Sequence, residues 1–454
     1  MKFPRYPDYT TTEVPWLGDI PSHWHIDRLK WSADTVVNGV WGGEPTGDED
    51  TACIRVADFD RVALRVVLDN LTYRSVEEKD KGRRLLSPGD LLLEKSGGGE
   101  QQLVGAVVEF NHGFPAVCSN FVAKVVHADG MNGRYWTYVH AHLYSGRVNY
   151  PSIKQTTGIQ NLDSSAYFNE LVAYPPYEEQ WHVAAFLDRE TARIDALVEK
   201  KRCLLQMLEE KRLALITQAV TKGLDADVPM KDSGIKWLGE VPGHWETKRV
   251  KFLAAVGNGS TPKRDNAEYW VDGEFPWLNS SVVNHDQVEE PTELVTKKAL
   301  EECHLPVITP PALLVGITGE GRTRGMVTTL VIEATINQHL AFIKPHPDEV
   351  SVEYLRLVFE RAYRYLRNES SGGGSTKGAI TCEQLRELVV PVPSADEQSS
   401  IVKSVHDSLG KLERAKKVIG LAIERLTEYR STLITNAVTG QIDVRNLNKG
   451  ASVA

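Results

Sequence analysis

The chain has 454 residues, which is too many for one ordinary domain of about 100–200 residues, so the length predicts two or three domains. Hydrophobic residues make up 41% and charged residues 25%, a globular composition that excludes disordered, collagen-like and purely coiled-coil proteins. A net charge of −9 argues against a protein that coats nucleic acid by bulk electrostatic attraction, so any contact with nucleic acid has to be local or shared with a partner.

The sequence also allows predictions about the cellular location of the chain and about disulfide bonds and metal sites. No apolar run approaches the length of a membrane span, and the first residues are polar and broken by proline. We therefore expect no membrane span, no secretory signal and a cytoplasmic location. The five cysteines lie far apart, without the spacing of a zinc site or a disulfide framework, so we expect reduced thiols and no metal.

An internal repeat divides the chain into two halves. The segment WLGDIPSHWHIDRLK, which begins at Trp16, returns as WLGEVPGHWETKRVK from Trp237. The segment ITQAVTKGLD, from Ile216, returns as ITNAVTGQID from Ile434. A period near 220 residues is far longer than the roughly 20–50 residues of solenoid repeats, so the repeat predicts a duplicated unit of one domain and one helix.

The first part of each half consists of short apolar runs separated by Gly, Pro and Asn. Residues 90–110 and 312–332 have the pattern of a strand, a glycine turn and a second strand. Helical stretches are predicted near residues 133–145 and 351–368, each followed by a glycine- or threonine-rich loop and an apolar strand that ends in proline. We expect a mixed α/β domain with a curved sheet in each half.

The second part of each half predicts one long helix. Residues 178–222 contain neither Gly nor Pro, and residues 395–439 contain two Gly and no Pro. Apolar positions recur every seven residues in both segments and keep the same register, which predicts a seam through which the two helices pack on each other. The predicted seam consists of Leu187, Ile194, Val198, Leu205, Leu208, Leu215, Val405, Leu412, Ile419, Ile423, Leu426 and Leu433.

Local signals mark the ends and one irregularity of these helices. Ser394 and Glu397 have the spacing of a capping box, and Gly223 and Gly440 follow the two C-terminal ends. Gly410 and Gly420 lie inside the second helix, where each costs about 1 kcal/mol relative to alanine. They either bend this helix or mark a close contact.

Catalytic motifs have no support. Tyr174-Pro-Pro-Tyr177 resembles the motif of amino-methyltransferases, but its first residue lacks the amide or carboxylate that accepts a bond from the target amine. Glu77-Glu78-Lys79 has the spacing of some nuclease motifs but lies in a highly charged turn. The sequence contains no phosphate-binding glycine loop and no nucleophile elbow. The repeated His-Trp pairs, His23-Trp24 and His244-Trp245, are explained better by shared packing than by catalysis.

Two windows are suited to nucleic acid. Residues 130–162 contain no Asp or Glu, and they carry basic and aromatic side chains such as Arg134, Lys154 and Tyr138. The second half has an arginine- and tyrosine-rich stretch at 361–367 that runs into SSGGGSTKG. Small hydroxyl-bearing loops of this kind let the backbone approach phosphates, while adjacent Gln, Lys, Arg and Thr reach base edges. A solvated helix face followed by a flexible loop is the alternative for either window alone.

These paired motifs make the chain resemble the specificity subunit of type I restriction-modification systems over its whole length. WLGDIPSHW and WLGEVPGHW open the halves, YPPYEEQ and VPVPSADEQ enter the helices, and ITQAVTKGLD and ITNAVTGQID leave them. The resemblance implies an α+β fold of two tandem α/β target recognition domains with pseudo-two-fold symmetry, joined by two long helices in an antiparallel coiled coil. The expected parts are residues 1–177 (first domain), 178–222 (first helix), 223–236 (linker), 237–393 (second domain), 394–440 (second helix) and 441–454 (tail).

The resemblance further implies function, partners and cofactors. Each domain would read one half of a split double-stranded DNA target, and the helices would set the gap between the halves. The chain would have no catalytic residue and no cofactor of its own. It would recruit two modification (methyltransferase) subunits that use S-adenosylmethionine and, through them, restriction subunits that use ATP and Mg²⁺.

The predicted DNA-binding residues lie in loops of both domains. They are Lys154, Gln155, Thr156, Thr157 and Gln160, with Ser96, Gly97, Gly98 and Gln101, in the first domain, and Gly374, Ser375, Thr376 and Lys377, with Arg322 and Arg324, in the second. A protein–protein scaffold that assembles other subunits without reading DNA remains the alternative function.

Overall fold

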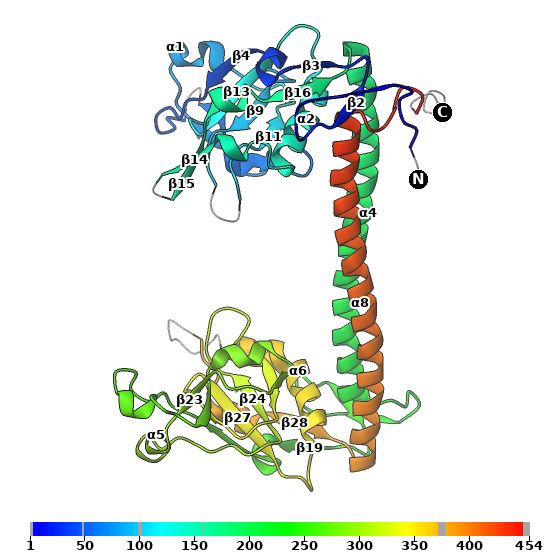
Figure 1. The fold of residues 1–454 in the computed structure, drawn as a ribbon. Helices are drawn as coiled ribbons and strands as arrows, with labels where there is room; N and C mark the ends of the chain where they lie inside the picture. Colours follow the sequence, from blue (N-terminus) through cyan, green and yellow to red (C-terminus); the bar gives the residue numbers. More distant parts are fainter. Residues whose placement is uncertain (1–2, 48–49, 99–101, 157, 371–377, 448–454) are drawn as a thin grey trace. The chain divides into compact units, whose positions relative to one another are not determined.

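The computed structural model describes residues 3–47, 50–98, 102–156, 158–370 and 378–447. The chain forms two compact units, which we call the first unit (residues 1–201 and 421–454) and the second unit (residues 202–420). Each unit therefore contains one mixed domain and a part of both long helices, which are labelled α4 and α8 in Figure 1. Within the described part of the chain, no helix has the length and hydropathy needed to cross a membrane.

The long helices have ends that match their sequence signals. Helix α4 is Tyr177–Lys222 and helix α8 is Ala395–Val438. The capping box at the start of α8 is confirmed, because the Glu397 amide donates to Ser394 Oγ at 3.3 Å and the Ser394 amide donates to Glu397 Oε2 at 3.3 Å. Gly223 and Gly440, just past the two helix ends, have φ of +75° and +74°, the left-handed conformation that favours glycine at this position.

Segments of α4 and α8 pack side by side inside each unit. In the first unit, Arg430 Nε lies 2.9 Å from Asp195 Oδ1; in the second, Lys416 Nζ lies 2.5 Å from Glu209 Oε1. The residue numbers in each pair add to 625, so both units share one antiparallel register. Every residue of the predicted seam is buried or half-buried, and Leu187, Ile194, Val198, Val405, Leu412 and Leu433 are the most buried of them.

Nothing in the structure requires glycine at the two irregular positions of α8. The helix continues through Gly410 and Gly420, a Cβ added at Gly420 would meet nothing within 4 Å, and one at Gly410 would meet only Arg414 Nη1, at 3.6 Å. Neither glycine therefore marks a close contact within the part of this chain that the structure describes.

Gly420→Ala should raise the free energy of unfolding by about 0.5–1 kcal/mol, because alanine loses less backbone entropy in a helix. Urea unfolding midpoints of the full chain measure the effect. Gly440→Ala is the matched control: there the added Cβ would lie 2.3 Å from Pro21 Cδ at a positive φ, so the same substitution should destabilise. A lower midpoint for Gly420→Ala would contradict the prediction.

The first unit is built on a six-stranded sheet in the order β4-β13-β9-β11-β7-β6. Its central strand β9 carries a continuous apolar run because both of its faces are buried, with Leu91 and Leu93 packed on one side and Leu92 on the other. A second sheet has the order β12-β5-β8. The strands are β4 (Ala33–Asn38), β5 (Thr51–Ile54), β6 (Phe59–Asp60), β7 (Arg65–Val66), β8 (Thr72–Arg74), β9 (Leu91–Glu94), β11 (Val107–Glu109), β12 (Ala116–Cys118) and β13 (Val122–His127).

The second unit repeats this topology. Its main sheet has the order β20-β27-β24-β25-β22 and its second sheet the order β23-β21-β26. Strands β20, β27, β24, β25 and β22 of the second unit correspond, in this order, to β4, β13, β9, β11 and β7 of the first. The repeat in the sequence is therefore a repeat of the fold. The strands are β20 (Ala254–Asn258), β21 (Phe275–Leu278), β22 (Gln287–Val288), β23 (Glu293–Val295), β24 (Ala312–Gly316), β25 (Val327–Leu330), β26 (Thr335–Ile336) and β27 (Leu340–Pro345).

The smaller elements complete the two units. The predicted helices are confirmed as α2 (Gly133–Ser145) and α6 (Val352–Glu369). Short antiparallel pairs join β1 to β2, β3 to β16, β17 to β18 and β19 to β28. Their bounds, with the short helices, are β1 (Tyr9–Thr11), β2 (Asp19–Pro21), β3 (His25–Arg28), α1 (Glu78–Lys81), α3 (Ser164–Tyr167), β16 (Leu171–Tyr174), β17 (Met230–Asp232), β18 (Glu240–Pro242), β19 (Glu246–Arg249), α5 (Lys297–Glu302), α7 (Cys382–Glu387) and β28 (Val389–Val392).

The repeated His-Trp pairs hold the start of each long helix. In the first unit, Glu179 Oε1 accepts bonds from Trp24 Nε1 at 3.0 Å and Tyr6 Oη at 2.6 Å, and Glu179 Oε2 lies 2.8 Å from His23 Nε2. Burial, followed by the bond to Glu179, raises the pKa of Tyr6 well above its usual value, so this hydroxyl remains a donor. The packing explanation for the His-Trp pair therefore holds in this unit.

The second unit repeats the contact in a more exposed form. Glu397 Oε1 accepts from Trp245 Nε1 at 3.1 Å and lies 2.8 Å from His244 Nε2. Its side chain is 37% exposed, whereas that of Glu179 is 8% exposed. Burial alone would raise the pKa of Glu397, but the bonds from His244, Trp245 and Ser394 lower it.

The glutamine after each of these glutamates fixes the domain helix to the long helix. Gln180 Oε1 accepts from the amide of Asn132, the N-cap of α2, at 2.9 Å. Gln398 Oε1 accepts from the amide of Ser351, the N-cap of α6, also at 2.9 Å. The repeated Glu-Gln pair is thus a joint that sets how each domain sits on its own helix segment.

Acid should destabilise the first unit selectively. Burial lowers the pKa of His140 to about 3 and that of His142 to about 4. In the unfolded chain a histidine has a pKa of about 6.5. The contribution of each neutral histidine to the free energy of unfolding is therefore fully present above that pH and is lost as the pH falls toward 4. The loss is about 2 kcal/mol per histidine at pH 5. The matching positions of the second unit, Val358 and Glu360, carry no histidine.

Denaturant unfolding at pH 7 and pH 5, with limited proteolysis to locate the opened unit, measures this effect. The double variant His140→Gln/His142→Gln should lower the free energy of unfolding at pH 7 but flatten its dependence on pH. An equal loss of both units at pH 5 would contradict the prediction.

Candidate nucleic-acid interface

A three-stranded sheet in the first unit brings the predicted DNA-binding residues of this domain together. Strand β10 (Ser96–Gly97) pairs with β15 (Ile159–Leu162), which pairs with β14 (Ile153–Thr156). Strand β10 therefore joins β14 and β15, which form an antiparallel pair where the sequence suggested a loop. Ser96 faces Asn161 across the strands, and Ser96 Oγ donates to Asn161 Oδ1 at 2.6 Å.

The side chains of this sheet divide into exposed and structural ones. Lys154 is 73% exposed, and its Nζ lies 2.7 Å from Asp163 Oδ2; Gln155 is exposed as well. Gln160, in contrast, is 4% exposed and its Oε1 accepts from the Val104 amide at 3.2 Å. Gln160 thus holds the backbone at Val104, and the expectation that it contacts DNA is not supported.

The remaining expected residues of this domain are only partly described. Gly98 is exposed with φ of +64°, and a Cβ there would lie 2.7 Å from the Gln102 carbonyl oxygen, so this position requires glycine. Thr156 is described only as part of the backbone of β14. Gln101 and Thr157 lie outside the described residues.

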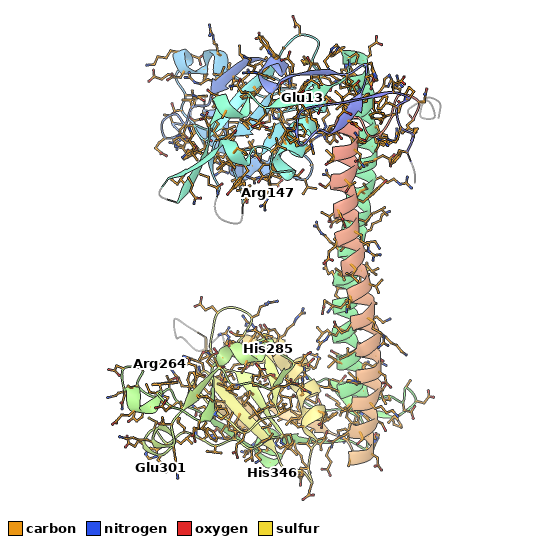
Figure 2. The ribbon with its side chains drawn as sticks, in the orientation of Figure 1. Glu13, Arg147, Arg264, His285, Glu301 and His346 are labelled. Carbon is orange, nitrogen blue, oxygen red and sulfur yellow. The ribbon has the colours of Figure 1, made fainter. Side chains whose placement is uncertain are left out.

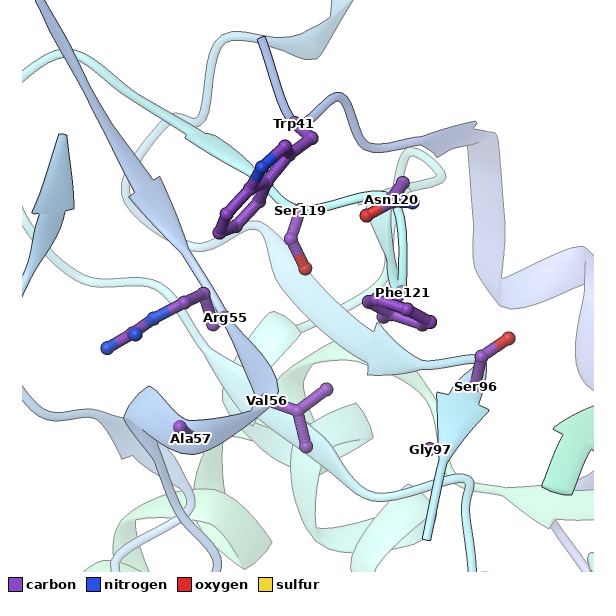
Figure 3. Close-up of a pocket in the computed structure, with 9 residues that line it drawn as sticks. All are labelled: Trp41, Arg55, Val56, Ala57, Ser96, Gly97, Ser119, Asn120 and Phe121. Atoms are coloured by element: carbon purple, nitrogen blue, oxygen red, sulfur yellow. The ribbon is translucent and has the colours of Figure 1, made fainter. Parts of the chain in front are cut away.

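A hollow of about 420 Å³ opens beside β10. Figure 3 shows the rings of Trp41 and Phe121 on its wall with the Ser119 hydroxyl between them. Trp41 is 38% exposed and Phe121 47%, whereas Ser119 is 2% exposed. The sequence reasoning missed this hollow. Its lining residues are Trp41, Arg55, Val56, Ala57, Ser96, Gly97, Ser119, Asn120 and Phe121.

The turn that carries Ser119, Asn120 and Phe121 is built in the same way in both units. It connects β12 to β13, and Gly39 packs against it so closely that a Cβ would lie 2.2 Å from the Ser119 carbonyl oxygen. In the second unit, residues 337–339 connect β26 to β27, and a Cβ on Gly259 would lie 1.7 Å from the Ile336 carbonyl oxygen. Glycine is therefore required beside both turns.

The second turn presents different side chains. Residues 337–339 are Asn337, Gln338 and His339, and the last two are exposed. Gln338 Oε1 accepts from Thr261 Oγ1 at 2.5 Å, and His339 Nδ1 lies 2.8 Å from Thr318 Oγ1. Sequence reasoning missed both residues, although the offset of 218 that relates the helices also relates this turn to 119–121.

The glycine hairpin of the second unit is held by the end of α6. Arg367 Nη1 donates to the Arg324 carbonyl at 3.1 Å, and Tyr363 Oη donates to the Arg322 carbonyl at 2.9 Å. Arg322 is exposed, but Arg324 is 6% exposed, so the structure does not present its side chain to a ligand as expected. Gly374, Ser375, Thr376 and Lys377 lie outside the described residues.

The basic and aromatic window at 130–162 is mainly structural. Tyr135, Trp136 and Tyr138 are at most 1% exposed and belong to the core of the first unit. Arg134 Nε lies 2.7 Å from Asp188 Oδ1, so this guanidinium fixes α2 to α4. The reading of the whole window as a DNA-binding surface is therefore wrong. Its exposed members include Arg147, labelled in Figure 2, and Tyr150.

Comparisons with known proteins agree with this architecture. Residues 242–419 match the family model described as "Type I restriction modification DNA specificity domain". The putative type I restriction enzyme MjaX specificity subunit of Methanocaldococcus jannaschii is 21% identical over 453 residues, 98% of this chain and 99% of that protein. The MjaIX specificity subunit of the same organism is 32% identical over 187 residues, 40% of this chain and 41% of that protein.

A solved structure has the same fold. It is described as "Structural basis underlying complex assembly and conformational transition of the type I R-M system", and its chain matches with a TM-score of 0.65 at 16% identity, over 92% of this chain and 98% of that one. The match extends over both halves of the chain.

Proposed function

Because the chain belongs to the family of type I restriction-modification specificity subunits, we propose that it is the DNA-recognition subunit of a methyltransferase and endonuclease complex. In this proposal each unit reads one half of a bipartite double-stranded DNA target. The helices α4 and α8 set the gap between the half-sites and dock two modification subunits. The chemistry takes place on these partners, which bring S-adenosylmethionine, and on restriction subunits, which bring ATP and Mg²⁺.

The observation that carries this proposal is the equivalent turn with different side chains in the two units. Ser119, Asn120 and Phe121 in the first unit correspond to Asn337, Gln338 and His339 in the second, on strands of the same topology. The backbone of the turn is the same in both units, whereas its polar and aromatic side chains differ. This difference suits two domains that read different bases, since amides and imidazoles form hydrogen bonds with base edges. A scaffold that only assembles subunits would have no use for this exchange.

The net charge of −9 leads us to expect a low affinity of the isolated chain for DNA. Most of the phosphate contacts that give DNA affinity have to come from partners, so the isolated chain should bind weakly and the complex with modification subunits tightly and specifically. Affinities at one fixed salt concentration measure this difference.

Methylation mapping tests the reading of DNA. The chain is co-expressed with its modification subunits, and methylated adenines in host DNA are located by single-molecule sequencing. Gln338→Ala should relax one half of the mapped target by about 1–3 kcal/mol, and Asn120→Ala, the matched variant in the first unit, should relax the other half. A target that does not depend on this chain would favour the scaffold, and equal weakening of both halves by either variant would contradict separate reading.

A further inference from the structure

The hollow beside β10 has the composition of a site for a flat aromatic ligand. Its volume of about 420 Å³ lies within the range of about 300–1,000 Å³ that is typical of small-molecule sites. Trp41 and Phe121 line it and are 38% and 47% exposed, and the Arg74 guanidinium lies over the Trp41 ring at 4.7 Å. Every nucleic-acid base has a π face that stacks on such side chains.

The wall of the hollow also contains a buried hydroxyl group that can form a hydrogen bond with a ligand. Ser119 is 2% exposed, and its Oγ has no hydrogen-bond partner among the residues that the structure describes. Figure 3 shows this hydroxyl directed into the space between Trp41 and Phe121. Buried hydroxyl groups are normally paired, so Ser119 Oγ is free to donate to or accept from an atom of a bound ligand. Asn120, which follows it, is exposed at the rim and adds an amide with both donors and an acceptor.

The charge and surroundings of the hollow indicate the source of that ligand. Among the lining residues that the structure describes, Arg55 is the charged one, and none of them is Asp or Glu. The Arg55 side chain is 34% exposed, and its guanidinium is paired with the Asp58 carboxylate at 2.8 Å. The hollow also shares Ser96 and Gly97 with the sheet that presents Lys154 and Gln155. Nucleic acid on that sheet would pass directly beside the opening.

We propose that this pocket receives one nucleobase that is unstacked from the first half-site of the DNA target. The proposal rests on the DNA-reading function proposed above and adds a way of reading. The base would stack on Trp41 and Phe121, and its hydrogen-bonding edge would meet Ser119 and Asn120, as in proteins that take a base out of the helix. In the second unit the equivalent turn carries His339 in place of the exposed Phe121, so the inference concerns the first half-site alone.

Fluorescent base analogues test the proposal in the complex of the full chain with its modification subunits. Duplexes with the mapped target carry 2-aminopurine or pyrrolocytosine at each position of the first half-site in turn, and unstacking raises their fluorescence. One position other than the methylated adenine should respond. Trp41→Ala and Phe121→Ala should abolish that response and weaken binding of the target about 10- to 100-fold. Both side chains are exposed, so these variants should fold.

Two further variants separate a ligand site from a structural one. Tyr73→Ala removes a 52% exposed ring elsewhere in the first unit and should change neither fluorescence nor affinity. Ser119→Ala removes the unpaired hydroxyl, so it should leave the unfolding midpoint unchanged or higher while it lowers affinity for the target several-fold. A fall in stability with unchanged affinity would overturn the role given to Ser119.

The outcomes also distinguish this inference from the proposed function. If the complex binds the mapped target specifically but only the methylated adenine responds, or if the response survives Trp41→Ala and Phe121→Ala, the pocket inference is wrong and DNA reading stands. If the complex shows no sequence preference that depends on this chain, the proposed function fails first.

Discussion

Glu179→Ala should lower the free energy of unfolding of the first unit by about 3–5 kcal/mol, because it leaves buried donors without their acceptor. The carboxylate receives bonds from Trp24 Nε1 and Tyr6 Oη, which lie in the N-terminal segment of the first unit. Trp24 is 6% exposed and Tyr6 3%, so water cannot replace the lost acceptor without opening this packing. The joint between domain and helix should therefore loosen first.

Denaturant unfolding of the full chain, with limited proteolysis to identify the opened segment, measures this loss. Glu178→Ala is the matched control, since Glu178 precedes Glu179 on α4 and is exposed. Glu179→Gln, which keeps the shape and one acceptor oxygen, should cost less than alanine. Glu397→Ala should also cost less, because the second copy of the joint is more exposed. Equal losses for Glu178→Ala and Glu179→Ala would contradict the importance of the joint.

A heptad inserted into each long helix should lengthen the gap of the DNA target and leave both half-sites unchanged. The register in which paired residue numbers add to 625 places Leu205 opposite Gly420, so insertions after Leu205 and after Ile419 lie opposite each other. Seven residues keep every seam position on its face and add about 10 Å to each helix. At about 3.4 Å per base pair, the gap should grow by up to about three base pairs.

Methylation mapping with the modified chain reads the new gap directly. The original target should lose its methylation, and a target with the same two halves and a longer gap should gain it. Insertion of two residues at the same positions is the control, because it rotates the seam away from its partner and should cost stability or solubility before recognition changes. A soluble heptad variant that still methylates the original target would show that the helices do not set the distance.

Features that depend on neighbours along the chain could be predicted from the sequence. The seven-residue seam, the capping box of Ser394 and Glu397 and the glycines after both helices are local patterns, and the structure places the helix ends within a few residues of them. The strand, turn, strand pattern at 312–332 is confirmed by the antiparallel pairing of β24 and β25. The repeat itself indicated two domains of one topology, because segments of similar sequence at the same offset adopt similar structures.

Which residues are exposed at the candidate DNA-binding site depends on contacts with residues that are distant in the sequence. Composition alone does not predict these contacts. Gln160 and Arg324 have the residue types of DNA contacts, but segments far away in the chain bury them. Tyr135 and Trp136 looked like a stacking surface and fill the core of the first unit, since an aromatic side chain serves either purpose equally well. The hollow beside β10 forms only where the turn at 119–121, Trp41 and the segment after β9 meet, so the tertiary structure alone decided it.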